Sequence, residues 1–166
     1  MKKTVCIVMM IFVVALCSST LFAAGPCSKA EVKANVEKVA AILEKEGTAF
    51  YAKIPAYHFC DNNYVYVSDM TATILAHGFM PHLVGKCIIG IKDDTGYKFF
   101  ADLVAKIKSS TATKNGKTYY NGATWIKYRW PSPKDKTKFE NKLVYAQGVL
   151  LPNGDNVFVA AGTYEQ

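Results

Sequence analysis

The sequence predicts an α+β domain in which a five-stranded antiparallel sheet packs against a long leading helix. An amphipathic helical pattern covers residues 28–46, and five later segments show the two-residue alternation of strands. Short connections between successive strands favour antiparallel pairing. The 166 residues are enough for one domain and leave little room for a second.

Residues 1–24 have the order of a secretory signal peptide. Two lysines precede an apolar run over 5–16, and Ala23 and Ala24 provide the small residues of a cleavage site. The alternative is an uncleaved N-terminal membrane anchor, because the run approaches the lower length limit for spanning a bilayer. We therefore expect residues 25–166 to form one exported domain, periplasmic or secreted.

The leading helix is predicted from its ends and its apolar face. Ser28 followed by Glu31 forms a capping box, and Gly47 provides the stop. The apolar positions at helical spacing are Val32, Val36, Val39 and Leu43. A second apolar stripe predicts a helix over 99–107. The first helix is expected to cover one face of the sheet.

The expected strands are 64–68, 74–77, 125–130, 142–149 and 157–163. The first two form a hairpin that places His77 beside a bend, and a rigid hairpin ending in a polar side chain next to a loop is a common ligand site. Residues 109–123 read as a polar loop, with a possible hairpin tip at Asn115-Gly116.

The charge distribution argues against one class of partner, and the cysteines suggest a disulfide. The formal net charge is +7, but the lysines are interspersed with acids and form no basic stripe with aromatics, which argues against nucleic acid. Beyond the signal segment remain Cys27, Cys60 and Cys87. A Cys60–Cys87 disulfide is preferred because both flank the hairpin, and two free thiols are the alternative. No CxxC motif occurs, and no cofactor is expected.

Seven short motifs then occur in a characteristic order. They are Tyr64-Val65-Tyr66-Val67-Ser68-Asp69, Leu75-Ala76-His77, Leu83-Val84-Gly85-Lys86, Asp93-Asp94-Thr95-Gly96, Tyr128-Arg129-Trp130-Pro131, Lys142-Leu143-Val144-Tyr145 and Ala161-Gly162-Thr163-Tyr164. Over residues 28–164 the chain resembles the single Cache domain (type 2), the extracytoplasmic sensor module of bacterial chemoreceptors and kinases. The resemblance implies a PAS-like Cache fold with a ligand pocket on the face opposite the long helix.

The resemblance also implies a function, which is binding without catalysis. The expected ligand is a small organic acid such as acetate, propionate, pyruvate or lactate, and the expected partner is a membrane receptor or sensor kinase. The ligand-binding positions carried over are His58, Tyr64, Tyr66, His77, Tyr128, Trp130, Pro131, Lys142 and Tyr145. Lys142, His58 and one tyrosine suit a buried carboxylate, while Trp130 and the tyrosines suit a short alkyl tail.

Two positions depart from the family pattern. His58 stands where relatives often have arginine, which removes the bidentate fork and makes anion binding pH-dependent. Gly78 stands where relatives more often have proline after the histidine. The stretch at 109–123 is also longer than expected and could alter the pocket lid.

Other readings of the same residues stay open. His77 could be a core histidine, the tyrosines ordinary strand aromatics, and Lys142 a solvated edge lysine. An accessory interaction protein without its own ligand is the alternative function. A small hydrolase or metal site using His58 and His77 is disfavoured, since no GxSxG, HxH or HExxH motif occurs. The oligomeric state is left open, with a weak dimer possible.

Overall fold

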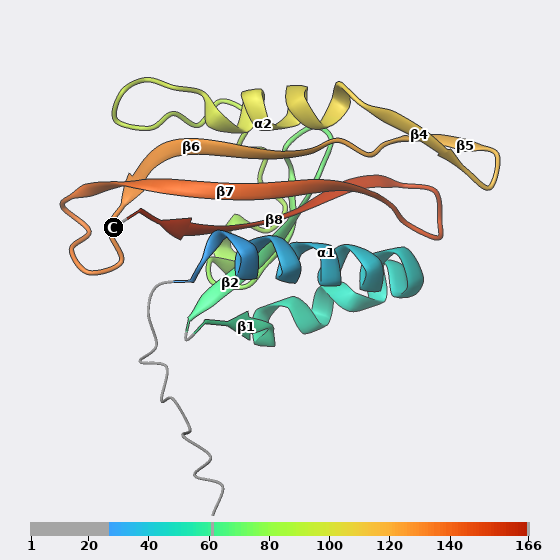
Figure 1. The fold of residues 1–166 in the computed structure, drawn as a ribbon, viewed down its shortest axis with the longest axis horizontal. Coiled ribbons are helices and arrows are strands. Elements are labelled where there is room, and N and C mark those ends of the chain that lie inside the picture. The colour runs from blue at the N-terminus through green and yellow to red at the C-terminus, as the bar shows by residue number, and fades with distance from the viewer. Residues whose placement is uncertain (1–26, 61, 166) are drawn as a thin grey trace, which may run out of the picture.

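The computed structural model describes residues 27–60 and 62–165, and it places an antiparallel sheet between two helices (Figure 1). The predicted α+β class is confirmed. The predicted signal peptide at 1–24 lies outside the described residues. Within the described part of the chain, no helix has the length and apolar character needed to cross a bilayer.

Helix α1 (Lys29–Glu46) begins and ends where the sequence predicts. The Ser28 hydroxyl accepts the Glu31 N–H at 3.2 Å, and the Glu31 carboxylate accepts the Ser28 N–H at 2.9 Å, which completes the capping box. Gly47 terminates the helix at φ +63°, a backbone conformation that a glycine adopts without steric cost. A 3-10 helix, η1 (Gly47–Ala56), follows directly.

The main sheet has six strands, one more than expected. They are β1 (His58–Phe59), β2 (Asn63–Asp69), β3 (Ile74–His77), β6 (Ala123–Pro131), β7 (Phe139–Leu150) and β8 (Asn156–Tyr164). The order is β1-β2-β8-β7-β6, with β3 also paired to β2. The additional strand, β1, has two residues, which is too short to produce a detectable alternation.

The stretch at 109–123 is a second, two-stranded sheet rather than a loop with a hairpin tip. Strands β4 (Thr111–Lys114) and β5 (Lys117–Tyr120) pair along their whole lengths. Asn115 and Gly116 have φ values of 53° and 74°, as required at the centre of a tight type I′ turn. The predicted tip is therefore correct, and the polar strands beside it were missed because their side chains are largely exposed.

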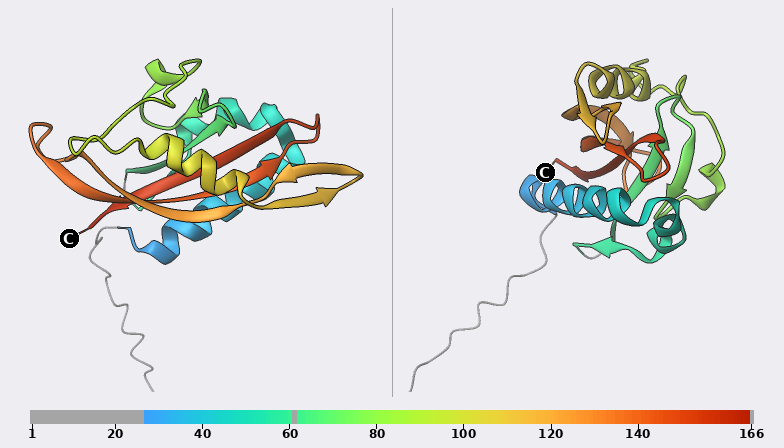
Figure 2. Two further views of the ribbon diagram at one scale, coloured as in Figure 1. Left: turned by 90° about the horizontal axis from the view of Figure 1, so that it is seen from above. Right: turned by 90° about the vertical axis from the view of Figure 1, so that its right-hand side faces the viewer.

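Two helices cover opposite faces of the sheet, as the end-on view in Figure 2 shows. Helix α1 packs on β7 and β8, and helix α2 (Phe99–Lys108) packs on β6 and β7 from the other side. Between β3 and α2 the chain forms a long connection that includes the 3-10 turn η2 (Pro81–Leu83).

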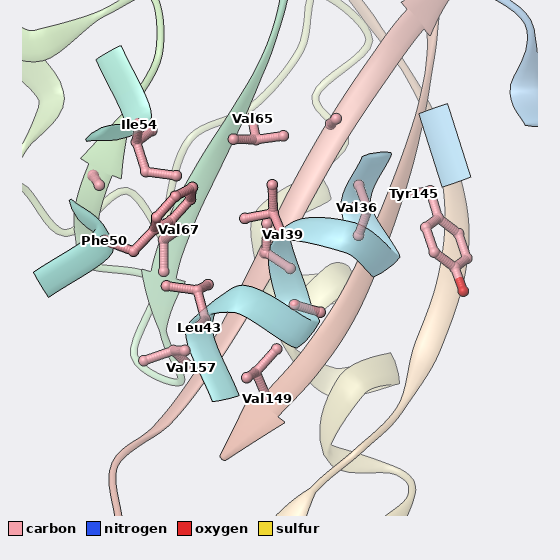
Figure 3. Packing of buried hydrophobic residues seen from close by; sticks show 14 of the residues in the cluster. Val36, Val39, Leu43, Phe50, Ile54, Val65, Val67, Tyr145, Val149 and Val157 are labelled. Atoms are coloured by element: carbon pink, nitrogen blue, oxygen red, sulfur yellow. The ribbon is translucent and has the colours of Figure 1, made fainter. Parts of the chain in front are cut away.

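Each face of the sheet carries its own apolar core. On the α1 face, side chains of α1 and η1 meet alternate residues of β2, β7 and β8 (Figure 3). On the other face, α2 packs on a set that includes Tyr66, Tyr128 and Phe158. Strand side chains alternate between the two faces. On β7, therefore, Lys142 and Val144 share the face opposite α1, whereas Tyr145 lies on the α1 face.

Candidate functional site

The face opposite α1 gathers six polar or aromatic side chains near the start of β7 and the end of β8. We call them the polar cluster: Tyr64, Tyr66, His77, Tyr128, Lys142 and Tyr164. Strand register brings them together, because Tyr66 is opposite His77, and Lys142 is opposite both Tyr128 and Tyr164. These residues come from five strands, and side-chain alternation in the sequence does not fix the register between them.

Lys142 is the charged member of the polar cluster, and it is only 5% exposed. Its Nζ atom donates to the Tyr64 phenolic oxygen at 3.2 Å and lies 5.1 and 5.3 Å from the ring centroids of Tyr64 and Tyr164. Among the described residues it forms no ion pair. A buried ammonium is costly unless it is paired, so this group is suited to receive an anion.

Gly162 on β8 makes room for the Lys142 side chain. A Cβ atom at position 162 would lie 2.9 Å from Lys142 Cε and 2.7 Å from Val144 Cγ2. Both distances are well inside van der Waals contact, so a larger residue would displace the lysine stem. The glycine in the closing motif is therefore part of the site's construction.

His77 is held as a neutral imidazole. Its Nδ1 atom accepts the backbone N–H groups of Phe79 and Met80 at 3.0 and 2.8 Å, which assigns the ring proton to Nε2. Burial, together with the nearby charges of Lys142 and His82, lowers the pKa of His77 to about 4. His77 therefore offers an Nε2–H donor to the cluster throughout the neutral range.

The tyrosines complete the donor set. Burial raises the pKa of Tyr66 and of Tyr128 above the usual range, and neighbouring phenols of the cluster add to this effect. The Tyr66 ring stacks on His77 at a centroid distance of 5.6 Å, and Tyr128 stacks on Phe99 at 3.9 Å. Among the described residues neither of these two hydroxyls has a hydrogen-bond partner. Both remain protonated and able to donate.

A cavity of about 970 Å³ opens beside the polar cluster. Lys142, Tyr64 and Tyr164 belong to both, so the cluster forms the buried side of the cavity. Trp130 and Phe79 form apolar walls; Phe79 is 57% exposed and stacks on Tyr64 at 5.5 Å. The full lining is Cys27, His58, Cys60, Asn62, Asn63, Tyr64, Phe79, Met80, Trp130, Pro133, Lys134, Lys136, Glu140, Lys142, Thr163, Tyr164 and Glu165.

Most of the predicted site residues come together here. Seven of the nine lie in the polar cluster or the cavity wall: His58, Tyr64, Tyr66, His77, Tyr128, Trp130 and Lys142. His58 lies at the exposed edge of the cavity. Pro131 takes part through its carbonyl oxygen, which accepts the Tyr164 hydroxyl at 2.9 Å. That these residues bind a ligand stays a prediction.

Tyr145 is not part of this group. It lies on the α1 face (Figure 3). There its ring packs on Trp125 at 5.1 Å and under the Lys33 ammonium at 6.0 Å. The reason is strand geometry: an odd spacing of three residues from Lys142 turns the two side chains to opposite faces. The same rule, applied to the sequence, would have excluded Tyr145.

Several lining residues were not predicted. Tyr164 shares a face with Gly162 by strand alternation, so the closing motif contained a signal for it. Phe79 and Met80 follow His77 directly, but their approach to the cavity depends on the bend that the imidazole stabilises. No local pattern in the sequence indicates that bend geometry.

The disulfide is Cys27–Cys60, and the predicted Cys60–Cys87 pairing is wrong. The Cα atoms of Cys27 and Cys60 are 5.4 Å apart, because α1 lies across the sheet with its first turn beside the β1–β2 connection. Cys87 is free and exposed, and its thiol donates to the Thr71 carbonyl at 3.3 Å. The Glu31 carboxylate lies near the bonded pair, but sulfurs joined to each other are not thiolate metal ligands.

Asp93 fixes the long connection that carries Phe79 and Met80 to the sheet. Its carboxylate accepts the Thr95 hydroxyl at 2.6 Å and the N–H groups of Thr95, Tyr97 and Arg129 at 2.9, 3.0 and 3.1 Å. Burial acts to raise the pKa of Asp93, but these hydrogen bonds outweigh it and lower the pKa to about 2. The hydrogen bond from the Arg129 N–H joins the connection to β6.

Gly78, which departs from the family pattern, has a local explanation. Its N–H donates to the Val65 carbonyl at 3.0 Å, and a Cβ atom at 78 would lie 2.8 Å from Tyr64 Cβ. Proline lacks this donor and carries a Cβ. The close approach of β2 therefore requires glycine at this position.

Comparison with known proteins agrees with the fold and the motifs. A family model described as Single Cache domain 2 matches residues 18–164. A solved Cache chemosensory domain, studied for carboxylic acid recognition, is 25% identical with a TM-score of 0.58, and the match covers 80% of this chain and 86% of that chain. A search of curated protein sequences finds no significant match.

Two further solved structures share the fold. The periplasmic sensor domain of a chemotaxis protein is 22% identical with a TM-score of 0.62, covering 82% of this chain and 94% of its own. A methyl-accepting chemotaxis protein from Vibrio parahaemolyticus is 20% identical with a TM-score of 0.58, covering 82% and 87%. The chain belongs to the single Cache domain 2 family, the family that its motifs predicted.

Proposed function

We propose that this protein is an extracytoplasmic sensor domain that binds a small carboxylate and does not transform it. The observation that carries the proposal is Lys142, a buried ammonium whose hydrogen-bond partner is a neutral phenol and which forms no ion pair within the described residues. A carboxylate placed against it would supply the missing negative charge.

The neighbouring donors suit the same ligand. Tyr64 lines the cavity beside Lys142, and its hydroxyl accepts from the lysine while keeping a proton to donate to a carboxylate. His77, Tyr66 and Tyr128 belong to the same polar cluster but not to the cavity lining, and they are proposed as further donors. Trp130 provides an apolar surface for a short tail. In the related Cache chemosensory domain, carboxylic acids are the recognised class, which supports the assignment.

The test is calorimetric titration of the purified protein with acetate, propionate, pyruvate and lactate, together with thermal-shift measurements. We expect at least one acid to bind, and Lys142→Met to weaken that binding by roughly a hundredfold through loss of a buried charge partner. The matched control is Lys33→Met, which removes an exposed lysine on the opposite face of the sheet. Absence of binding by all four acids, or unchanged binding by Lys142→Met, would contradict the proposal.

The output is proposed to pass to a membrane receptor or sensor kinase. Support comes from the related periplasmic domain, which is the sensor of a chemotaxis protein. Crosslinking of the protein to membranes of the cells that produce it, with and without the acid, tests this step. Equal capture in both conditions would argue against ligand-dependent signalling.

A further inference from the structure

The cavity is much larger than a small acid requires. Its volume of about 970 Å³ is at the upper end of the range of pockets that enclose drug-sized ligands, roughly 300–1,000 Å³. A two- to four-carbon acid at Lys142 would leave most of this space unfilled. The remaining lining should therefore indicate what else the ligand carries.

Two lysines line the exposed side of the cavity, on the connection between β6 and β7. Lys134 and Lys136 are exposed, and neither forms an ion pair within the described residues. Their neighbour Lys138 differs, since it lies outside the lining and pairs with Asp135 at 3.4 Å. The connection between β6 and β7 therefore places two lysines without an ion-pair partner, among the described residues, at the cavity.

The acids of the lining do not cancel these charges. Glu165 is neutralised by Lys127 at 2.5 Å, which leaves Glu140 as the one unpaired carboxylate among the described lining residues. Lys134, Lys136 and Lys142 together outnumber it. The cavity is therefore electropositive at both its buried and its exposed sides.

Apolar side chains also line the cavity that these lysines share. Trp130, Phe79, Met80 and Pro133 line the cavity, and Phe79 lies flat against Tyr64 with 20° between the ring planes. An exposed aromatic ring that forms a cavity wall is well placed to cover an apolar ligand body.

We propose that the cavity takes an elongated acid with two anionic groups separated by an apolar body. One carboxylate binds at Lys142, the body lies between Trp130 and Phe79, and the second anionic group faces Lys134 and Lys136. This inference rests on the proposed function, because it uses the Lys142 carboxylate site as its first anchor. It adds a second subsite and a different ligand class.

The test compares the affinities of dicarboxylic acids with those of monocarboxylic acids that have the same carbon skeleton. The probes are straight-chain α,ω-dicarboxylates of three to ten carbons beside monocarboxylates of equal length, and terephthalate beside benzoate. We expect at least one diacid to bind roughly tenfold more tightly than its monoacid, the contribution expected of two exposed ion pairs. Raising the salt concentration should reduce this ratio.

Variants assign the second subsite. Lys134→Gln with Lys136→Gln should reduce the diacid-to-monoacid ratio to near one, whereas Lys138→Gln, on the same connection, should leave it unchanged. All three lysines are exposed, so folding is expected to be unaffected, which melting temperatures check. Glu140→Gln should raise the ratio by removing the unpaired acid.

The outcomes separate this inference from the proposed function. If monoacids bind through Lys142 and no diacid exceeds its monoacid, the second subsite is refuted and the carboxylate site stands. If a diacid preference exists but survives the double substitution, the subsite assignment is refuted. If no acid of either kind binds, the proposed function itself is refuted.

Discussion

The ammonium of Lys142 lies 3.2 Å from the phenolic oxygen of Tyr64, and this neutral group is its hydrogen-bond partner within the described structure. A core lysine without a counterion reduces stability, because its charge has left water without a compensating ion pair. The buried lysine is explained if a bound ligand supplies the negative charge that compensates it. Binding residues of this kind should stabilise the complex and destabilise the free protein.

The first prediction concerns the stability of the free protein. Lys142→Met keeps the length of the side chain and removes its charge, so the free energy of unfolding without ligand should rise by about 1–3 kcal/mol. Urea denaturation measures this change. A variant that is less stable than the wild type would indicate that Lys142 has a structural role.

The second prediction concerns pH. The pKa of His77 is about 4 in the folded protein and about 6.5 in the unfolded chain. Between these two pH values the unfolded chain therefore binds a proton at His77 that the folded protein does not bind. The contribution of His77 to the free energy of unfolding is fully present above about pH 6.5. It is lost as the pH falls towards 4, and the total loss is about 3 kcal/mol.

The matched variant for His77 is His77→Asn. The Asn oxygen can still accept the Phe79 and Met80 N–H groups, while the titrating ring is removed. Unfolding free energies measured from pH 7.5 to pH 4 should therefore fall less steeply in the variant. Parallel profiles would show that other groups dominate the pH dependence.

The third prediction concerns the cysteines. The Cys27–Cys60 bond closes a loop with a sequence separation of 33, for which chain entropy gives about 4 kcal/mol of stabilisation. Cys27→Ser should lower the unfolding free energy by about 2–4 kcal/mol. Cys87→Ser, which removes an exposed free thiol, is the control and should change little. Non-reducing peptide mapping should recover the 27–60 linkage; a 60–87 linkage would overturn the assignment.

The fourth prediction compares two adjacent acids. Asp93→Ala leaves three backbone N–H groups without their acceptor, so it should cost about 2–4 kcal/mol and weaken acid binding by loosening the connection over the cavity. Asp94→Ala removes a partly exposed pair with Arg129 at 3.2 Å and should cost less than about 1 kcal/mol. Equal effects would show that Asp93 does not anchor the connection.

Local patterns were sufficient for the elements whose signals lie within a few residues. The capping box, the apolar face of α1 and the alternation of the long strands each depend on near neighbours, and the structure has them where predicted. Two errors had different origins. Tyr145 was misplaced although strand alternation excluded it, whereas β1 was missed because two residues show no period.

The sequence by itself determined the fold class, the two helices and the family, because periodicity, caps and short motifs are properties of contiguous residues. Only the tertiary structure decided which side chains meet. It paired Cys27 with Cys60, brought Lys142 to Tyr64 across 78 residues, and joined Asp93 to the Arg129 backbone. These contacts depend on the order of the strands in the sheet and on how α1 crosses it. The spacing of residues along the sequence does not indicate such long-range geometry.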